Sequence, residues 1–96
     1  MVRRPKPILD PKIAACAPNA PHLTDYDYTL LICYLRLLDA EKEGADWREV
    51  ARIVLKTDPE HDYQRAKQCY DTHLMRAHWM TEQGYQHLLQ EADHEW

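Results

Sequence analysis

Proline and glycine are distributed very unevenly along this chain of 96 residues. Five of the six prolines lie within residues 1–22, and from residue 23 onward only Gly44, Pro59 and Gly84 interrupt the chain. Proline lacks a backbone N–H and disrupts helices, whereas glycine often ends them. The sequence therefore predicts an irregular, proline-rich arm over residues 1–22, followed by helices that are separated at these three positions.

The first uninterrupted stretch, which ends at Gly44, carries a helix start signal. Thr24 and Asp27 stand three residues apart and resemble a capping box, with Asp in place of the usual Glu. Residues 28–38 are largely apolar and would cover most of the circumference of a helix. We expect one helix from residue 25 to about residue 43, buried on more than one side. The alternative is an uncovered apolar face that binds another protein.

Two further helices follow, each with its own start signal. Asp46 is a suitable N-cap for a short helix over about residues 47–56. Asp58 followed by Pro59 is typical of a helix start, because proline is tolerated at the first helical position. No interruption follows until Gly84, so this third helix can be about 25 residues long. Its expected core stripe comprises Tyr63, Ala66, Tyr70, His73, Leu74, Ala77 and Thr81.

These signals predict an all-α fold, a compact bundle of about four helices, with the fourth at about residues 85–93. A long helix, a short helix and another long helix form the outline of a helix-turn-helix domain. Within residues 44–51, a glycine ends one helix, an aspartate starts the next, and Trp47, Val50 and Ala51 are placed to pack against the third. Residues 23–96 are therefore interpreted as a domain with a helix-turn-helix-like core.

The charge is divided between the two parts of the chain. Residues 1–22 carry four basic residues and one acidic residue, whereas residues 23–96 carry eight basic and fifteen acidic ones. Neutralisation of phosphates by basic side chains supplies much of the affinity for duplex DNA. An acidic body argues against a domain that binds DNA by itself, although Arg3, Arg4 and Lys6 could form a minor-groove arm. The alternative is that this basic arm is a solvated tail.

Several classes of function are disfavoured by the sequence. Two glycines forty residues apart cannot form a phosphate-binding loop, and no apolar run is long enough to span a membrane. Three cysteines without a CxxC motif, and no apparent signal peptide, indicate free thiols in the cytoplasm. Cys69 and His73 have metal-ligand spacing but no second pair of ligands. We expect no enzymatic activity, metal, cofactor or small-molecule ligand.

Three runs in the chain resemble a known family, with the similarity covering roughly residues 24–90. They are Leu38-Asp39-Ala40, Gly44-Ala45-Asp46-Trp47-Arg48-Glu49-Val50-Ala51 and Gly84-Tyr85-Gln86-His87-Leu88-Leu89. The family is a helix-turn-helix variant found in regulators of proteobacterial integrative and conjugative elements, and this chain looks like the QseM-type quorum-sensing antiactivators. The resemblance implies a protein that binds and inhibits transcriptional activators, namely a LuxR/TraR-type regulator and an activator that carries the same domain. Excision and conjugative transfer of the element would be repressed.

The third helix supplies the candidate binding residues. An acidic group at its start could complement a basic surface on an activator, or could serve only to stabilise the helix N-terminus. Met75 and Trp79, one turn apart opposite the core stripe, are suitable interface anchors unless the arm or the fourth helix covers them. The predicted protein-binding residues are Asp58, Glu60, Asp62, Gln64, Gln68, Asp71, Thr72, Met75 and Trp79.

The alternative function is a small, sequence-specific DNA-binding transcription factor. Its third helix would enter the major groove, as in other helix-turn-helix proteins. The basic residues that would contact DNA are then Arg65, Lys67 and Arg76. Under the main interpretation, the partners are activator proteins, and DNA is not expected to be bound by the chain alone.

Overall fold

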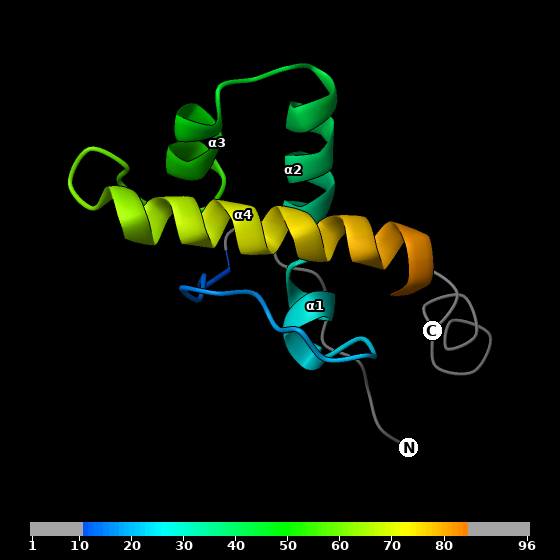
Figure 1. Ribbon diagram of the computed structural model, residues 1–96. Helices are drawn as coiled ribbons and strands as arrows, with labels where there is room; N and C mark the ends of the chain where they lie inside the picture. Colours follow the sequence, from blue (N-terminus) through cyan, green and yellow to red (C-terminus); the bar gives the residue numbers. More distant parts are fainter. Residues whose placement is uncertain (1–10, 85–96) are drawn as a thin grey trace.

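The structure, a computed structural model, describes residues 11–84. Their regular elements are α1 (Asp25–Thr29), α2 (Leu31–Lys42), α3 (Trp47–Ile53), α4 (Tyr63–Trp79) and a π-helical turn η1 (Met80–Gly84). No strand occurs in these residues, so the all-α prediction is confirmed. The long helix α4 crosses the α1–α2 unit, with α2 and α3 on one side of it and α1 on the other (Figure 1). The fourth helix expected at residues 85–93 lies outside the described residues.

The predicted first helix is interrupted at Leu30. The capping box at its start is present: the Thr24 side chain accepts from the Asp27 backbone N–H, and the Asp27 carboxylate accepts from the Thr24 backbone N–H. Leu30, with φ −95° and ψ 12°, then separates α1 from α2. Leu30 is neither glycine nor proline, so local sequence gives no sign of this break. Its side chain is fully buried, and the break turns it into the core.

The turn from α2 to α3 forms as the sequence predicts. Gly44 has φ +75°, a left-handed conformation that glycine adopts without steric cost. Backbone N–H groups of Gly44 and Ala45 then bond the carbonyls of Glu41 and Ala40, which closes the end of α2. The Asp46 carboxylate accepts from the Arg48 backbone N–H and starts α3.

The connection between α3 and α4 is longer than predicted. α3 ends at Ile53, and Lys56 adopts φ +58°, so the helix cannot continue to residue 56. The Asp58 carboxylate accepts from the backbone of Glu60 and His61, but these bonds cap only an isolated turn. α4 starts at a second cap, where the Asp62 carboxylate accepts from the Arg65 backbone N–H.

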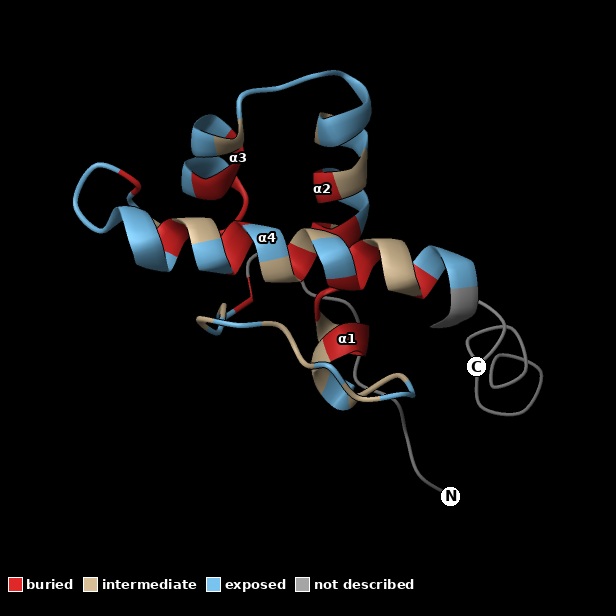
Figure 2. Cartoon of the chain, in the orientation of Figure 1, coloured by how far each residue is buried: buried red, intermediate tan, exposed pale blue. Residues whose placement is uncertain are grey.

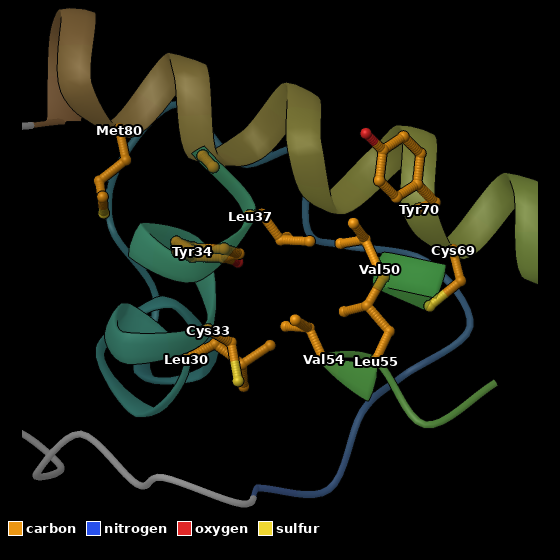
Figure 3. Close-up of a cluster of buried hydrophobic side chains, with 11 residues drawn as sticks. Leu30, Cys33, Tyr34, Leu37, Val50, Val54, Leu55, Cys69, Tyr70 and Met80 are labelled. Atoms are coloured by element: carbon orange, nitrogen blue, oxygen red, sulfur yellow. The ribbon is translucent and has the colours of Figure 1, made fainter. Parts of the chain in front are cut away.

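The core lies where α2, α3 and α4 meet. Buried positions recur along α4 and alternate with exposed ones, as expected of a helix with one side in the core (Figure 2). Figure 3 shows the cluster, in which side chains from the α2 side and the α3 side point toward one another beside α4. Its members are Leu30, Cys33, Tyr34, Leu37, Val50, Val54, Leu55, Cys69, Tyr70, Ala77 and Met80.

The predicted core stripe of the long helix is only partly confirmed. Ala66, Tyr70, His73 and Ala77 are buried. Tyr63, however, is half exposed even though its ring contacts Trp47 of α3, and Thr81 is exposed. Cys69 and Arg76 are buried as well, because the chain before α1 covers their side of the helix.

That covering segment, residues 11–22, is called the N-terminal strap below. It has no regular structure and runs along α4 on the side of α1 (Figure 1). The Cys69 thiol donates to the Ala14 carbonyl at 3.5 Å, and the Ala17 backbone N–H donates to the Thr72 hydroxyl at 3.1 Å. The strap is irregular, as its prolines predict, yet it is hydrogen-bonded to the helix along its length.

A buried ion pair joins α1, the strap and α4. Two guanidinium nitrogens of Arg76 donate to the two carboxylate oxygens of Asp27, at 3.0 and 2.7 Å. The remaining bonds of Arg76 go to the carbonyls of Ala20 and His22, and Asp27 also accepts from the Tyr34 hydroxyl. Burial alone would raise the pKa of Asp27, but the bonds from Arg76, Thr24 and Tyr34 outweigh it and lower that pKa.

Breaking this ion pair should destabilise the domain strongly. Replacing Arg76 by Met leaves the Asp27 carboxylate buried without its partner, and we expect a loss of about 3–5 kcal/mol in the free energy of unfolding. Urea titration followed by circular dichroism measures it. Glu41→Gln, which removes the half-exposed Glu41–His78 pair, should cost less than about 1 kcal/mol. A loss for Arg76→Met as small as that control would contradict this role.

A buried histidine makes stability depend on pH. The Nδ1 atom of His73 bonds the Cys69 carbonyl and Nε2 meets the Tyr26 hydroxyl, both at 2.7 Å. Burial lowers the pKa of His73 below its ordinary 6.5, so the folded chain keeps a neutral ring where the unfolded chain takes up a proton.

The free energy of unfolding should therefore fall as the pH drops below 6.5, by at most about 1.4 kcal/mol per pH unit. Urea titrations at pH 7.5, 6.5 and 5.5 test this. His73→Gln should flatten the dependence, whereas His61→Gln, at an exposed position, should leave it unchanged. An equal slope in the native chain and His73→Gln would show that another group is responsible.

Candidate nucleic-acid interface

The helix α4 has a solvent-facing side at its N-terminal half. Gln64, Gln68 and Asp71 are exposed there, opposite the buried positions, and Arg65 is exposed at the edge toward the strap (Figure 2). Helix α3 precedes α4 and packs against it, which reproduces the arrangement of a helix-turn-helix. The outer side of α4 is thus presented as the recognition helix of such a motif would be.

An aromatic cluster fixes the position of one lysine beside this side. Trp47, the first residue of α3, packs against Tyr63 and Tyr70 of α4 with ring centroids 5.5 and 5.8 Å apart. The Lys67 ammonium lies 4.9 Å from the Trp47 ring centroid and 3.2 Å from the Asp71 carboxylate. Cation–π and ionic contacts together hold Lys67 at the junction of α3 and α4.

Four basic side chains on α3, on the turn after it and at the start of α4 have no acidic partner among the described residues. Arg48, Arg52, Lys56 and Arg65 are all exposed, and none of them takes part in an ion pair within residues 11–84. Arg48 lies over the Trp47 ring, 5.5 Å from its centroid. These four cations are available to an external anion.

The predicted acidic surface at the start of the helix has mainly a local role. The carboxylates of Asp58 and Asp62 accept hydrogen bonds from the backbone that follows them, and Asp71 is paired with Lys67. Glu60 alone of this group is exposed without such a bond in the described part of the chain. Acids that cap a helix start are favoured by its dipole and need no partner protein.

The remaining predicted site residues lie toward the strap. Thr72 accepts from the Ala17 backbone, and the Gln68 amide donates to the Cys16 sulfur. Met75 is 68% exposed, whereas Trp79 is half-buried with its ring stacked on the Arg76 guanidinium at 3.9 Å.

Arg76 differs from the sequence-based expectation of a DNA-contacting residue. It is 5% exposed, and its bonds go to Asp27 and to the strap carbonyls. The sequence places Arg76 on α4 but does not indicate that a carboxylate of α1 lies beside it. The structure therefore leaves Arg65 and Lys67 as the basic residues of α4 that reach the surface.

The described residues show neither a metal site nor a membrane-spanning helix. Within residues 11–84, no three His, Cys, Asp or Glu side chains are placed to hold a metal ion. Cys69 and His73 are neighbours, but burial raises the pKa of the Cys69 thiol to about 11, so it stays protonated. None of the described helices is long and apolar enough to cross a membrane.

Comparison with known families matches the sequence of this chain to a family of DNA-binding domains. The model of the RovC_DNA-bd family, described as "T6SS, Transcription factor, DNA binding domain", matches residues 8–90, which include the strap and all of α1 to α4. The chain belongs to this family. No curated protein matches it. By that description, a RovC-type domain is the DNA-binding part of a transcription factor.

This membership corrects two sequence-based predictions. The assignment as a QseM-type antiactivator that acts by binding activators is wrong, since the family is one of DNA-binding domains. The expectation that DNA is an unlikely partner is wrong for the same reason. The antiactivator assignment rested on the resemblance of three runs and on the acidic net charge of residues 23–96, and that net charge does not show where the exposed cations of α3 and α4 lie.

The capping role of Asp62 can be separated from its charge. Asp62→Ala removes the acceptor for the Arg65 backbone N–H and should lower the free energy of unfolding by about 1 kcal/mol. Glu60→Ala removes the same charge without a cap and should change it by less than about 0.5 kcal/mol. Thermal and urea unfolding measure both. Equal effects of the two variants would mean that charge, and not the cap, is what matters.

Proposed function

We propose that this RovC-type domain binds duplex DNA in a transcription regulator and that α4 is its recognition helix. The observation that carries the proposal is the family match over residues 8–90, which includes the whole α3–α4 unit. The exposed N-terminal half of α4 supports it, because recognition helices contact base edges through such residues. DNA binding also agrees with the cytoplasmic location that the sequence predicts.

Three side chains on α4 suit the reading of bases. Gln64 and Gln68 are exposed amides one turn apart, and glutamine can pair with the N6 and N7 atoms of adenine. Arg65 is exposed beside them, and arginine pairs with the O6 and N7 atoms of guanine. Gln68 would have to exchange its bond to Cys16 for one to a base.

Four cations around these residues suit contacts to phosphate. Lys67 is held over Trp47, and Arg48, Arg52 and Lys56 are exposed on α3 and on the turn after it. Phosphate contacts position a protein on DNA without reading sequence. Lys67 would keep its place over Trp47 while its ammonium exchanges Asp71 for a phosphate.

The test is a selection from a random-sequence duplex library, followed by fluorescence anisotropy with the selected duplex at several salt concentrations. Lys67→Ala should weaken binding to all duplexes and reduce the slope of log affinity against log salt by about 1. Arg65→Ala or Gln64→Ala should instead cost about 1–3 kcal/mol on the selected duplex and relax sequence preference.

Matched controls come from α2. Arg36 and Lys42 are exposed cations on that helix, so Arg36→Ala and Lys42→Ala remove the same charge away from α3 and α4. We expect no change of slope or sequence preference in either. Enrichment of no sequence by the native chain, or losses as large in the α2 variants, would refute the proposed interface.

A further inference from the structure

A largely apolar groove lies between the N-terminal strap and the C-terminal half of α4. Its volume is about 570 Å³, and its walls are residues 16–21 of the strap together with Thr72, Met75, Arg76 and Trp79. This groove lies along α4 beyond Gln64 and Arg65, the residues proposed to read bases. None of its lining residues is acidic, and its one charged group, the Arg76 guanidinium, is already bonded to Asp27 and the strap.

Met75 exposes an apolar side chain to water in this groove, which is energetically unfavourable. At 68% it is the most exposed large apolar side chain of the described residues, and Trp79 and two strap prolines stand around it. Apolar side chains that gather in a concave site normally mark a surface that another segment covers. An apolar chain segment therefore fits this groove better than a nucleic acid does.

We infer that residues 85–96 of this same chain occupy the groove. The segment begins directly after η1, at the end of the helix that lines the groove. Tyr85, Leu88, Leu89 and Ala92 recur at the spacing of one helix face. The family match extends to residue 90, so Leu88 and Leu89 belong to the domain and not to a separate tail.

The lengths are compatible with this arrangement. The groove-lining stretch of α4 from Thr72 to Trp79 ends five residues, or about 8 Å of helix, before Gly84. Residues 85–87 in an extended form would span about 10 Å, which is enough to pass residues 80–84 and bring Leu88 to the groove. Gly84 stands at the point where the chain would reverse, and an antiparallel pair of helices needs only a short connection there. Leu88 and Leu89 would then lie against Met75 and Trp79.

Cys16, an exposed thiol in the groove wall, provides the test. Leu88→Cys, Leu89→Cys and Gln90→Cys are made one at a time in the full chain and oxidised with diamide. Gln90 is the matched control because it stands opposite the apolar face. An intramolecular disulfide to Cys16 should form at least about tenfold faster for Leu88→Cys or Leu89→Cys than for Gln90→Cys, because the docked segment raises the local thiol concentration.

Mass spectrometry of proteolytic peptides identifies the disulfide, and Cys16→Ser should abolish it. Equal rates at the three positions would overturn the inference. Concentration-dependent dimers linked through Cys16 would also overturn it, because a second copy would then be the occupant.

Nuclear magnetic resonance of the methionine methyl groups gives an independent readout. The chain has three methionines, so the Met75 methyl signal can be assigned by substitution. In a chain that ends at Gly84 and keeps its helical circular dichroism, the Met75 signal should shift while that of Met1 does not. In the full chain, Leu88→Asp combined with Leu89→Asp should produce the same shift. An unchanged Met75 signal in both would contradict the docking.

Discussion

The buried ion pair between Asp27 and Arg76 determines how the rest of this domain is arranged. It joins residues 49 positions apart and, through the carbonyls of Ala20 and His22, also attaches the strap to α4. A buried charge without a partner is very unfavourable, so α1 and the strap are confined to positions that satisfy Arg76. The break at Leu30 fits this requirement, because it allows α1 to place Asp27 beside Arg76 while α2 packs in the core.

The position of the proposed recognition surface follows from the same constraint. With one edge of α4 covered by the strap and another by α2 and α3, the side that carries Gln64, Gln68 and Asp71 is left to solvent. Trp47 then packs across the start of α4 and places Lys67 at the border of that side. The strap, α2 and α3 cover the other sides of α4 and so determine which side of it stays exposed. The strap is therefore as much a part of the domain as the helices.

The sequence predicts features whose causes lie within a few residues. The Thr24 capping box, the left-handed Gly44 and the Asp46 cap all depend on neighbours, and all three are present. The sequence did not show that α4 starts at Asp62, because Asp58 and Asp62 are both suitable N-caps. The left-handed conformation of Lys56 lies in the connection before them, and Asp62 is the residue that caps α4. The burial of Arg76 was missed because its partner lies in another helix. Helical periodicity could show that Gln64 and Gln68 face outward, but not that the strap reaches Gln68.

The acidic composition of the body shows why net charge is a poor guide to such an interface. At physiological salt, exposed charges farther apart than about 8 Å are largely screened from one another, so a phosphate responds mainly to the side chains beside it. Around the α3–α4 junction the exposed side chains include the cations Arg48, Arg52, Lys56 and Arg65 and the acids Glu49 and Glu60, whereas Asp58 and Asp62 bond their own backbone. Under the proposed function, such a surface would attract DNA locally while the molecule as a whole stays acidic. Under that proposal, affinity would rest on few contacts, and sequence reading by α4 would supply much of the preference for one site over another.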